Sequence, residues 1–508
     1  METVVVDDGG RVAARPAGGA VGGIVRTVLD NLEALAIALV MALILEYFLI
    51  EAYKIPTGSM QPGIMGDQHV GIYDRVLVNK LVYFLRDPER YEVVVFKNPL
   101  WQRQNYIKRA VGFGGERITL RNGDVFVTPP AGDREAIARK PDRVWAAVRK
   151  DLVARRDGDV DLARTFIVEQ GQGVSLAGER VVLPPGGEVR LRTKEAIHNR
   201  YLDGYEEEWV EAYASPVSGV PGRGLWTHLT GVEVTDAELA LEVTPGETAT
   251  QLVLEIRESG RSHRAELAVG EGRGMVLTTV ADGLDAVEWE DPAADATFAA
   301  LPRGVTTHVS FRNVDDELVL ALDDEVVLRR PYRTRGVDPD HDPRTRASLV
   351  THALLAARGG FTLEEVALWR DLHYLPDGDD KGSRAATFSI PEDEMMVLGD
   401  NTQNSWDCRQ WEKGTWHLAD GRVIEGNYFS AAEKGINPES NPAYDGAYIE
   451  FRNLYGQLYR FAEADTADGD PVTVDVHSVP REFLLGKALA IFWPLPPFSP
   501  TVRLKWVR

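Results

Sequence analysis

One long apolar run interrupts an otherwise mixed pattern of apolar and polar residues. Residues 34–45 contain no charged or strongly polar side chain, and apolar residues resume at 47–50 after Glu46. Residues 34–50 make a stretch of about 17 residues that is apolar except for Glu46, the lower limit for a helix that spans a bilayer. The pattern predicts a transmembrane helix over residues 31–50, preceded by a tail over residues 1–30.

Two other interpretations of this run are a buried core helix and a cleaved signal peptide. Cleavage would separate the run from the serine-containing segment that follows it directly. Arg11, Arg15 and Arg26 precede the run, whereas only Lys54 closely follows it. By the positive-inside rule, this distribution favours an amino terminus inside the cell and a carboxyl-terminal part outside.

Shorter apolar segments predict β-strands in the region that follows. The segments before residue 128 are 75–78, 92–96, 117–120 and 125–127. Asn122 and Gly123 separate the last two, and an Asn-Gly pair accepts the positive φ angles of a type I′ hairpin turn. The fold class is therefore expected to be mainly β, with antiparallel strands in this region.

The pattern changes twice further along the chain. Over residues 142–154 apolar residues recur at helical spacing, which predicts a short helix. Over about residues 222–375 apolar and polar residues alternate between turns rich in Gly, Asp and Pro. That spacing favours a β-sandwich. Segments 307–328 and 366–371 resemble the jelly-roll sandwiches related to legume lectins and laminin G modules, which bind sugars, bind proteins or only pack.

Composition narrows the functional classes. The 508-residue chain carries a formal net charge of -22, whereas binding of nucleic acid requires clustered cationic side chains. We therefore expect no nucleic-acid partner. The single cysteine, Cys408, excludes an intrachain disulfide and a multi-cysteine zinc site. The ten histidines are scattered without a His-Glu-x-x-His pair, so we also expect no metal.

A serine and a lysine are the candidate catalytic residues. Ser59 follows the apolar run within the segment 54–62, and no histidine is near it to act as its base. Lys108 lies in the segment 106–109 among apolar and aromatic residues. A lysine of ordinary pKa, about 10.4, is almost entirely protonated at pH 7, so it could remove a proton from serine only if burial lowered its pKa.

These segments, together with Gly-Asp-Asn and Ser-x-Asp-x-Arg in residues 399–409, resemble the bacterial type I signal peptidases. The resemblance covers roughly residues 30–127 and 385–508. It implies an antiparallel β signal-peptidase domain with its first part at 51–127 and its second part at 385–508. The intervening residues 128–384 are then an inserted domain that contains the β-sandwich.

The resemblance also implies roles for particular residues. The expected roles are nucleophile for Ser59, general base for Lys108, orienter of the lysine for Ser405, oxyanion donor for Thr57, and supporting network for Asp400, Asp407 and Arg409. Two positions depart from the family pattern. Thr402 replaces the arginine that usually follows Gly-Asp-Asn, and Gly63 replaces a threonine usual after the serine block. Neither change removes a group that the Ser-Lys pair needs.

The expected function is membrane-bound removal of signal peptides from exported preproteins after small residues, through an acyl-enzyme and without a cofactor. The expected location is the inner membrane, with one span and the catalytic domain on the extracytoplasmic side. An alternative is a membrane-tethered carbohydrate- or protein-binding module on an inactive peptidase scaffold. A self-cleaving serine/lysine protein of the repressor type is a third interpretation, which the apolar run disfavours. A glycan and a protein are both possible ligands of the insert, and the sequence does not decide between them.

Overall fold

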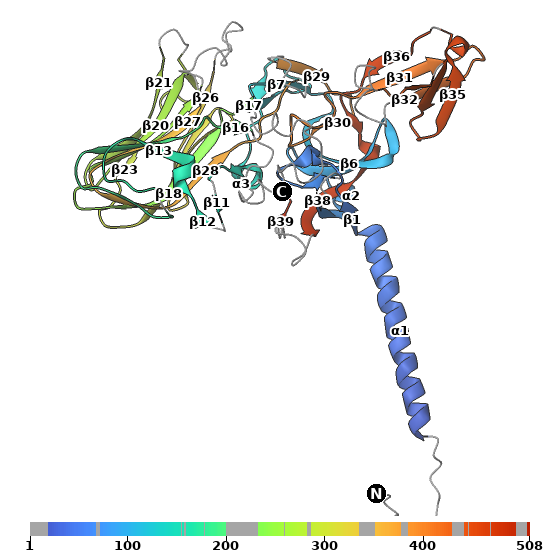
Figure 1. The fold of residues 1–508 in the computed structure, drawn as a ribbon, viewed down its shortest axis with the longest axis horizontal. Helices are drawn as coiled ribbons and strands as arrows, with labels where there is room; N and C mark the ends of the chain where they lie inside the picture. Colours follow the sequence, from blue (N-terminus) through green and yellow to red (C-terminus); the bar gives the residue numbers. More distant parts are fainter. Residues whose placement is uncertain are drawn as a thin grey trace, which may run out of the picture.

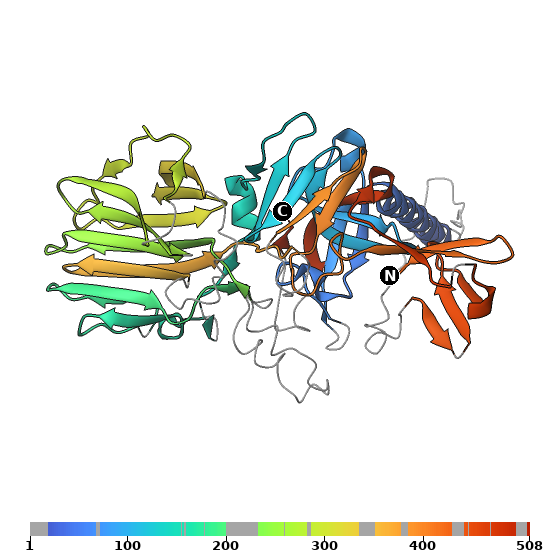
Figure 2. The same cartoon turned by 90° about the horizontal axis from the view of Figure 1, so that it is seen from above.

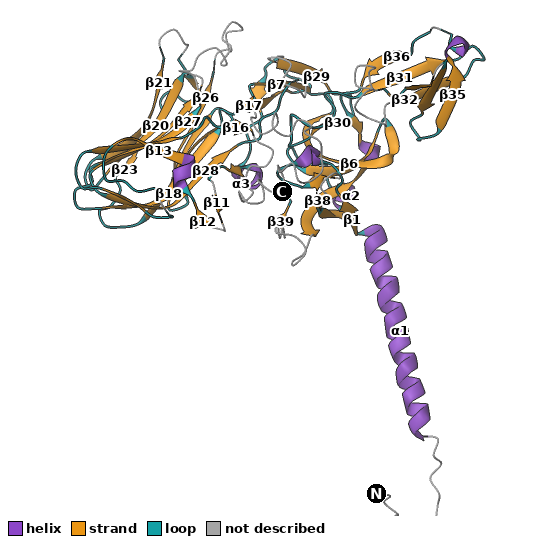
Figure 3. Cartoon of the chain, in the orientation of Figure 1, coloured by secondary structure: helices purple, strands orange, loops and turns teal. Residues whose placement is uncertain are grey.

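The computed structural model places a row of β-sheets beside one long projecting helix (Figure 1). It describes residues 19–67, 72–153, 155–156, 159–176, 178–199, 232–258, 260–281, 286–334, 351–376, 385–428, 441–445, 447–467, 469–493 and 505–507. Strands dominate these residues, and α1 is their only long helix (Figure 3). The expected mainly-β fold class is confirmed.

Helix α1 (Gly19–Phe48) begins before the expected residue 31 and points away from the sheets (Figure 1). Several of its large apolar side chains are exposed: Val25, Val28, Leu29, Leu32, Leu35, Ile37, Leu39, Val40, Met41, Ile44 and Phe48. Among the residues that the structure describes, no helix combines the length and apolarity needed to cross a membrane. The transmembrane helix expected at 31–50 is therefore not supported.

An antiparallel sheet forms the central part of the molecule. Its strands, in spatial order, are β1 (Ile50–Lys54), β4 (Arg75–Asn79), β38 (Leu484–Trp493), β5 (Val93–Asn98), β6 (Trp101–Phe113), β30 (Glu394–Leu398) and β37 (Val479–Pro480), with β39 (Lys505–Trp506) beside β38. β38 pairs with both β4 and β5, so strands from the two ends of the chain are adjacent. This arrangement brings the segments around residues 59, 108 and 400 together.

A second sheet extends the central part. It contains β29 (Ala385–Ser389), β7 (Arg117–Arg121), β8 (Asp124–Thr128) and β9 (Ala136–Ile137). In the turn between β7 and β8, Asn122 has φ 55° and Gly123 has φ 94°. Both values are positive, as a type I′ turn requires, so the predicted hairpin is confirmed.

The insert contains a two-sheet β-sandwich (Figure 2). One sheet has β10 (Lys150–Asp151), β28 (Phe361–Arg370), β18 (Ala237–Pro245), β24 (Thr307–Val314), β25 (Glu317–Leu322), β26 (Glu325–Arg333) and β22 (Glu288–Trp289), with β14 (Val181–Leu183) beside β28. The other has β13 (Phe166–Gln170), β15 (Glu188–Thr193), β27 (His352–Arg358), β19 (Gln251–Glu258), β20 (Arg261–Ala268), β21 (Arg273–Val280) and β23 (Thr297–Ala299). The sandwich therefore begins well before the expected residue 222, and residues 222–231 lie outside the described residues.

The alternation in the sequence explains the sandwich core. Leu239 and Leu241 of β18 and Leu252 and Leu254 of β19 are fully buried and belong to one apolar cluster. Residues two apart on a strand point to the same face, so both sheets turn their apolar faces inward. Burial of each such leucine contributes about 1.5–3 kcal/mol relative to exposure.

The insert also shares a hydrophobic core with the central sheets. Helix α3 (Asp142–Val148) buries Trp145 and Val148 in the same cluster as Ile118 of β7 and Val111 of β6. The helix is shorter than the expected 142–154, because the chain continues as strand β10 at residue 150. Residues from α3 therefore help to stabilise the central sheets rather than the sandwich alone.

Two small sheets form an additional lobe that sequence analysis did not predict (Figure 2). Their strands are β32 (Val423–Asn427), β31 (Glu412–His417) and β36 (Val472–Asp475) in one, and β33 (Ala443–Asp445), β34 (Tyr448–Arg452) and β35 (Leu458–Ala462) in the other. Trp416, Phe451 and Phe461 pack together between them. The remaining short elements are η1 (Gly58–Met60), β2 (Gly66–Asp67), β3 (Ile72–Tyr73), α2 (Val82–Leu85), β11 (Arg155–Arg156), β12 (Asp159–Val160), α4 (Leu162–Thr165), β16 (His198–Asn199), β17 (Val232–Glu233), η6 (Glu463–Asp465) and η7 (Arg481–Phe483).

Candidate active site

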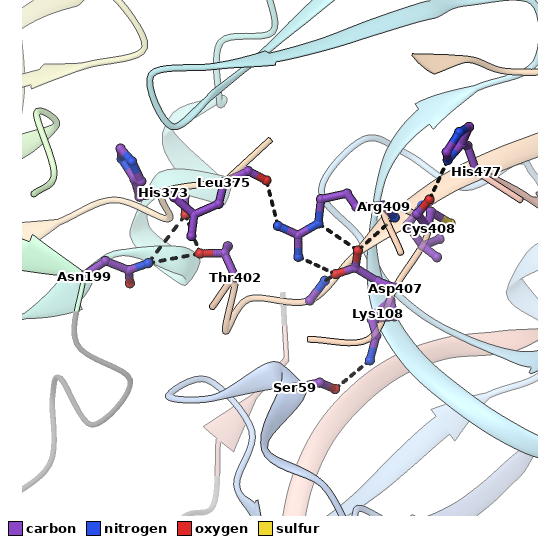
Figure 4. A network of polar contacts seen from close by, with 12 residues as sticks. Ser59, Lys108, Asn199, His373, Leu375, Thr402, Asp407, Cys408, Arg409 and His477 are labelled. Carbon is purple, nitrogen blue, oxygen red and sulfur yellow. Dashed lines mark hydrogen bonds and ion pairs between the residues drawn. The ribbon is translucent and has the colours of Figure 1, made fainter. Parts of the chain in front are cut away.

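Ser59 and Lys108 meet in the central sheet. Ser59 lies in the short helix η1, and Lys108 lies on β6, in register with Val94 of β5. The Lys108 Nζ atom is 2.6 Å from the Ser59 Oγ atom (Figure 4). The two residues are only 7% and 3% exposed, so bulk water hardly competes for this contact. The structure thus brings together the two residues that the sequence selected as nucleophile and base.

Burial changes the acid-base chemistry of Lys108. Removal of the ammonium from water lowers the pKa of Lys108 to about 8, while the negative charge of Asp407 opposes this effect. Lys108 Nζ also donates to the carbonyl of Ile107 at 3.2 Å. A pKa of about 8 leaves roughly one lysine in ten neutral at pH 7, and the neutral amine can accept the serine proton.

The Gly-Asp-Asn segment holds the serine loop from the other side. The Asn401 backbone N–H donates to the Ser59 carbonyl at 3.1 Å, and its side-chain amide donates to the Gly58 carbonyl at 3.0 Å. A Cβ at Gly399 would lie 2.4 Å from the Ser59 carbonyl oxygen, closer than real Cβ atoms come. This close approach of two backbones requires glycine at position 399.

Two buried Asp-Arg pairs stabilise the surrounding loops. Arg409 Nε and Nη2 donate to the two carboxylate oxygens of Asp407 at 2.8 and 2.7 Å. Arg109 Nε and Nη2 bind Asp400 in the same bidentate way, also at 2.8 and 2.7 Å. Burial alone would raise the pKa of each carboxyl, but the adjacent arginine outweighs it and holds the pKa of both Asp400 and Asp407 below its usual range.

The second pair includes a residue that sequence analysis did not single out. Arg109 follows Lys108 directly in the Tyr-Ile-Lys-Arg block, and this adjacency was the available signal. Successive strand residues point to opposite faces. Lys108 therefore faces Ser59 while Arg109 binds Asp400, so one strand supplies both the candidate base and an anchor for the Gly-Asp-Asn segment.

Two expected site residues lack the contacts that their predicted roles require. Ser405 is buried, but its hydroxyl makes no hydrogen bond of normal geometry within the described residues, although it contributes to the lowered pKa of Asp407. No Ser405–Lys108 hydrogen bond is found among these residues. Thr57 is exposed just before η1, where its hydroxyl does not cap the helix. Their roles as orienter and oxyanion donor stay predictions.

Both departures from the family pattern face the insert. The Thr402 hydroxyl donates to the His373 carbonyl at 2.8 Å and accepts from the Asn199 amide at 3.2 Å (Figure 4). A Cβ at Gly63 would lie 3.4 Å from the Nζ atom of Lys150. Asn199, His373 and Lys150 all belong to the insert, so the insert contacts the frame of the candidate site at these two positions.

The single cysteine, Cys408, lies next to the site, but its thiol is expected to be unreactive. Cys408 is fully buried, and burial raises the pKa of its thiol well above the usual range. Its Sγ atom accepts from the Val397 backbone N–H at 3.4 Å. Because the thiolate is the reactive form, Cys408 is a packing residue rather than a second nucleophile.

Part of the chain is similar to known signal peptidases. Residues 28–175 match the family described as signal peptidase, peptidase S26, a range that includes Ser59 and Lys108 but not residues 399–409. A probable signal peptidase I of Synechocystis is 33% identical over 129 residues, which are 24% of this chain and 56% of that protein. The signal peptidase I of Pseudomonas aeruginosa is 39% identical over 92 residues, 16% of this chain and 30% of that protein. The chain thus spans about half or less of these relatives.

Solved structures with similar folds are distant. A galectin from Caenorhabditis elegans covers 27% of this chain and 82% of its own, with 13% identity and a TM-score of 0.19. A carbohydrate-binding module from Bacillus subtilis covers 40% of this chain and 93% of its own, with 8% identity and a TM-score of 0.22. Similarity at this level carries no argument about ligands.

Proposed function

We propose that this chain, which carries a type I signal peptidase segment at residues 28–175, is a serine endopeptidase that removes signal peptides from exported preproteins. One observation carries the proposal: a buried lysine whose pKa is lowered to about 8 lies 2.6 Å from a buried serine hydroxyl. Such a pair supplies nucleophile and base without histidine.

In the proposed reaction, neutral Lys108 accepts the proton of Ser59 as Oγ attacks the scissile carbonyl. The carbonyl oxygen becomes negative and is stabilised by the Ser59 backbone N–H and the Thr57 hydroxyl. The protonated lysine then gives its proton to the leaving amine, and an acyl-enzyme remains. Lys108 next activates a water that hydrolyses the ester. The proposed substrates carry small side chains before the cut, as in Ala-x-Ala signal-peptide sites.

Cleavage of a model preprotein in detergent by the full chain tests the proposal. Ser59→Ala and Lys108→Ala should each abolish processing, and the double variant should be no worse, because the two residues act as a unit. Lys108→Arg should be equally inactive, since arginine stays protonated. Lys97→Arg is the matched control, because Lys97 is exposed on the neighbouring strand β5. Retained cleavage in Lys108→Arg would contradict the assignment.

We also propose that α1 holds the enzyme at a membrane. The exposed apolar side chains of α1 support this location, because large apolar surfaces rarely face water without a partner. The extracytoplasmic position of the site remains part of this proposal. Alkaline carbonate extraction of cell membranes should leave the full chain in the pellet and release a variant that lacks residues 1–48. Release of the full chain would contradict membrane anchoring.

A second candidate function concerns the sandwich alone. A cavity of about 330 Å³ opens on the outer face of its seven-stranded sheet and is lined by Thr250, Gln251, Glu266, Ala268, Arg273, Met275 and Arg358. Hydrogen-bond donors and hydrogen-bond acceptors both line the cavity, which suits a carbohydrate or a polar peptide. Screening the full chain against a glycan array, with Glu266→Ala as the comparison, would test this function. Unchanged binding by Glu266→Ala would remove the cavity from consideration.

A further inference from the structure

Thr402 joins the loop that holds Ser59 to the inserted domain. Its hydroxyl donates to the His373 carbonyl at 2.8 Å and accepts from the Asn199 amide at 3.2 Å (Figure 4). Thr402 is fully buried, and Asn199 and His373 are only 7% and 8% exposed. A hydroxyl carries one proton, and the amide nitrogen cannot accept it, so this proton is directed at His373. The two insert residues thus fix both the place and the direction of the Thr402 hydroxyl.

The central sheets in turn hold the His373 carbonyl in place. This carbonyl shares a trans peptide unit with the Tyr374 N–H, and the two groups of such a unit point in opposite directions. The Tyr374 N–H donates to the Gly123 carbonyl, in the turn between β7 and β8, at 2.9 Å. The side chains of Leu372 and Tyr374 are buried in the hydrophobic cluster of the central sheets. The hairpin therefore aims the His373 carbonyl at Thr402.

The same end of the insert holds the other side of the loop 399–409. The Leu375 carbonyl accepts from Arg409 Nη1 at 2.8 Å (Figure 4). Thr402 and Arg409, from the two halves of the loop, therefore both bind one short segment of the insert. Asn401, directly before Thr402, donates its backbone N–H to the Ser59 carbonyl at 3.1 Å. The contact with the insert and the contact with the candidate nucleophile are thus one residue apart.

Ser59 depends on such outside contacts for its position. It lies in η1, a helix of only three residues, which is preceded by Thr57 without a side-chain cap. Its Oγ atom must stay near the Lys108 Nζ atom, now 2.6 Å away, for proton transfer to occur. A misplacement of reacting groups by about 1 Å can lower a rate by about 10². Loosening of Asn401 should therefore slow the reaction itself.

We propose that Thr402 is a positioning residue for the reaction of Ser59 with Lys108, and that the insert holds it through Asn199 and the His373 carbonyl. This inference rests on the proposed peptidase function. Thr402 acts through Asn401 and the Ser59 backbone. The sequence showed position 402 only as a departure from the family pattern, because its partner Asn199 is 203 positions away.

The kinetics of Thr402 variants test the proposal, with kcat and KM of the full chain measured in detergent on a fluorogenic Ala-x-Ala peptide. Thr402→Val keeps nearly the same shape without the hydroxyl, and it should lower kcat about tenfold with KM within twofold of wild type. Thr402→Ser keeps the hydroxyl and should stay within twofold of wild type. Thr119→Val is the matched control, because Thr119 is also buried and bonds the Thr387 hydroxyl at 3.1 Å, between β7 and β29. Its kcat should stay within twofold of wild type.

A second measurement reports position without cleavage. Hydrogen–deuterium exchange followed by mass spectrometry should show residues 57–63 and 399–402 exchanging at least threefold faster in Thr402→Val. Thr402→Ser and Thr119→Val should leave this exchange unchanged. Asn199→Ala should raise the same exchange and lower kcat about threefold. It should cause no further loss in combination with Thr402→Val, because Asn199 acts through Thr402.

Each outcome decides the proposal. Unchanged exchange in Thr402→Val overturns it, whatever the activity. An equal loss of kcat in Thr402→Val and Thr119→Val, or a higher KM with unchanged kcat, also overturns it. If Thr402→Val fails to fold, unchanged exchange and kcat in Asn199→Ala overturn it instead. A wild type that does not cleave contradicts the peptidase function, and the exchange result alone then supports or overturns the positioning of Ser59.

Discussion

Replacement of Asp407 by asparagine is expected to shift the pH dependence of cleavage toward lower pH. The charge of Asp407 is the largest electrostatic influence that raises the pKa of Lys108 against the effect of burial. Asparagine keeps nearly the same shape and an oxygen that can accept from the Gly399 backbone N–H, now 2.9 Å away. The freed Arg409 acts in the same direction, because its positive charge lowers the pKa of Lys108.

The size of the shift follows from the protonation of the lysine. With a pKa of about 8, the neutral fraction of Lys108 rises roughly tenfold between pH 7 and pH 9, and kcat/KM of the wild type should rise with it. Loss of an opposite charge within about 4–6 Å changes a pKa by about 1–3 units. We expect the lower end, about one unit or 1.4 kcal/mol, because Arg409 already neutralises part of the Asp407 charge.

The assay is kcat/KM for a fluorogenic Ala-x-Ala peptide between pH 5.5 and pH 10, with enzyme in detergent. The midpoint of the rising limb should move from about 8 in the wild type to about 7 in Asp407→Asn. Asp420→Asn is the matched control, because Asp420 also pairs with an arginine two residues later, at 2.7 Å, but on an exposed turn. A midpoint that stays in place or moves upward in Asp407→Asn would refute the electrostatic argument.

Three further predictions follow from the same geometry. Thr57→Val should lower kcat by about 10²–10³ with little change in KM, while Thr57→Ser keeps most activity; a Val variant within a few-fold of wild type would exclude the oxyanion role. Lys108→Met should raise Tm at pH 7. Below the folded pKa of about 8 the buried lysine is charged, and this burial lowers the free energy of unfolding by up to about 3 kcal/mol. The gain in Tm should fade as the pH rises from 8 toward 10.5, because the lysine is then neutral in the unfolded chain as well. A lower Tm at pH 7 would contradict this. Deletion of residues 152–368, with Asp151 joined to Trp369 by an Asn-Gly turn, should keep cleavage within about tenfold of wild type, because these two residues lie opposite each other on β10 and β28. A monodisperse but inactive deletion protein would show that the sandwich builds part of the site.

Local chemistry made some features predictable from the sequence. The Asn122-Gly123 turn is set by the φ angles that these two residues accept, and it was found where the sequence placed it. The candidate nucleophile and base were selected by the resemblance of their segments to the type I signal peptidases, and the fold brings the two residues into contact.

Features that depend on long-range pairing were not predictable. Asp400 binds Arg109 across 291 positions of the sequence, and only the pairing of β30 with β6 makes the two neighbours. The helix expected at 142–154 ends at Val148, because Lys150 pairs with Arg370 in a strand and this tertiary contact outweighs helical periodicity. The early sandwich strands β13, β14 and β15 have only five, three and six residues, so their pattern was too short to detect.

The position of β38 between β4 and β5 has a consequence for biosynthesis. Strands β4 and β5 are made early, and the central sheet cannot close between them until β38, residues 484–493, has been synthesised. At about 5–20 residues per second, the ribosome needs roughly 20–80 s to extend the chain from Lys108 to that strand. The sandwich is contiguous between β10 and β28 and can fold during this interval. The nascent chain therefore acquires its Ser59–Lys108 contact in a closed sheet only after β38 has been synthesised.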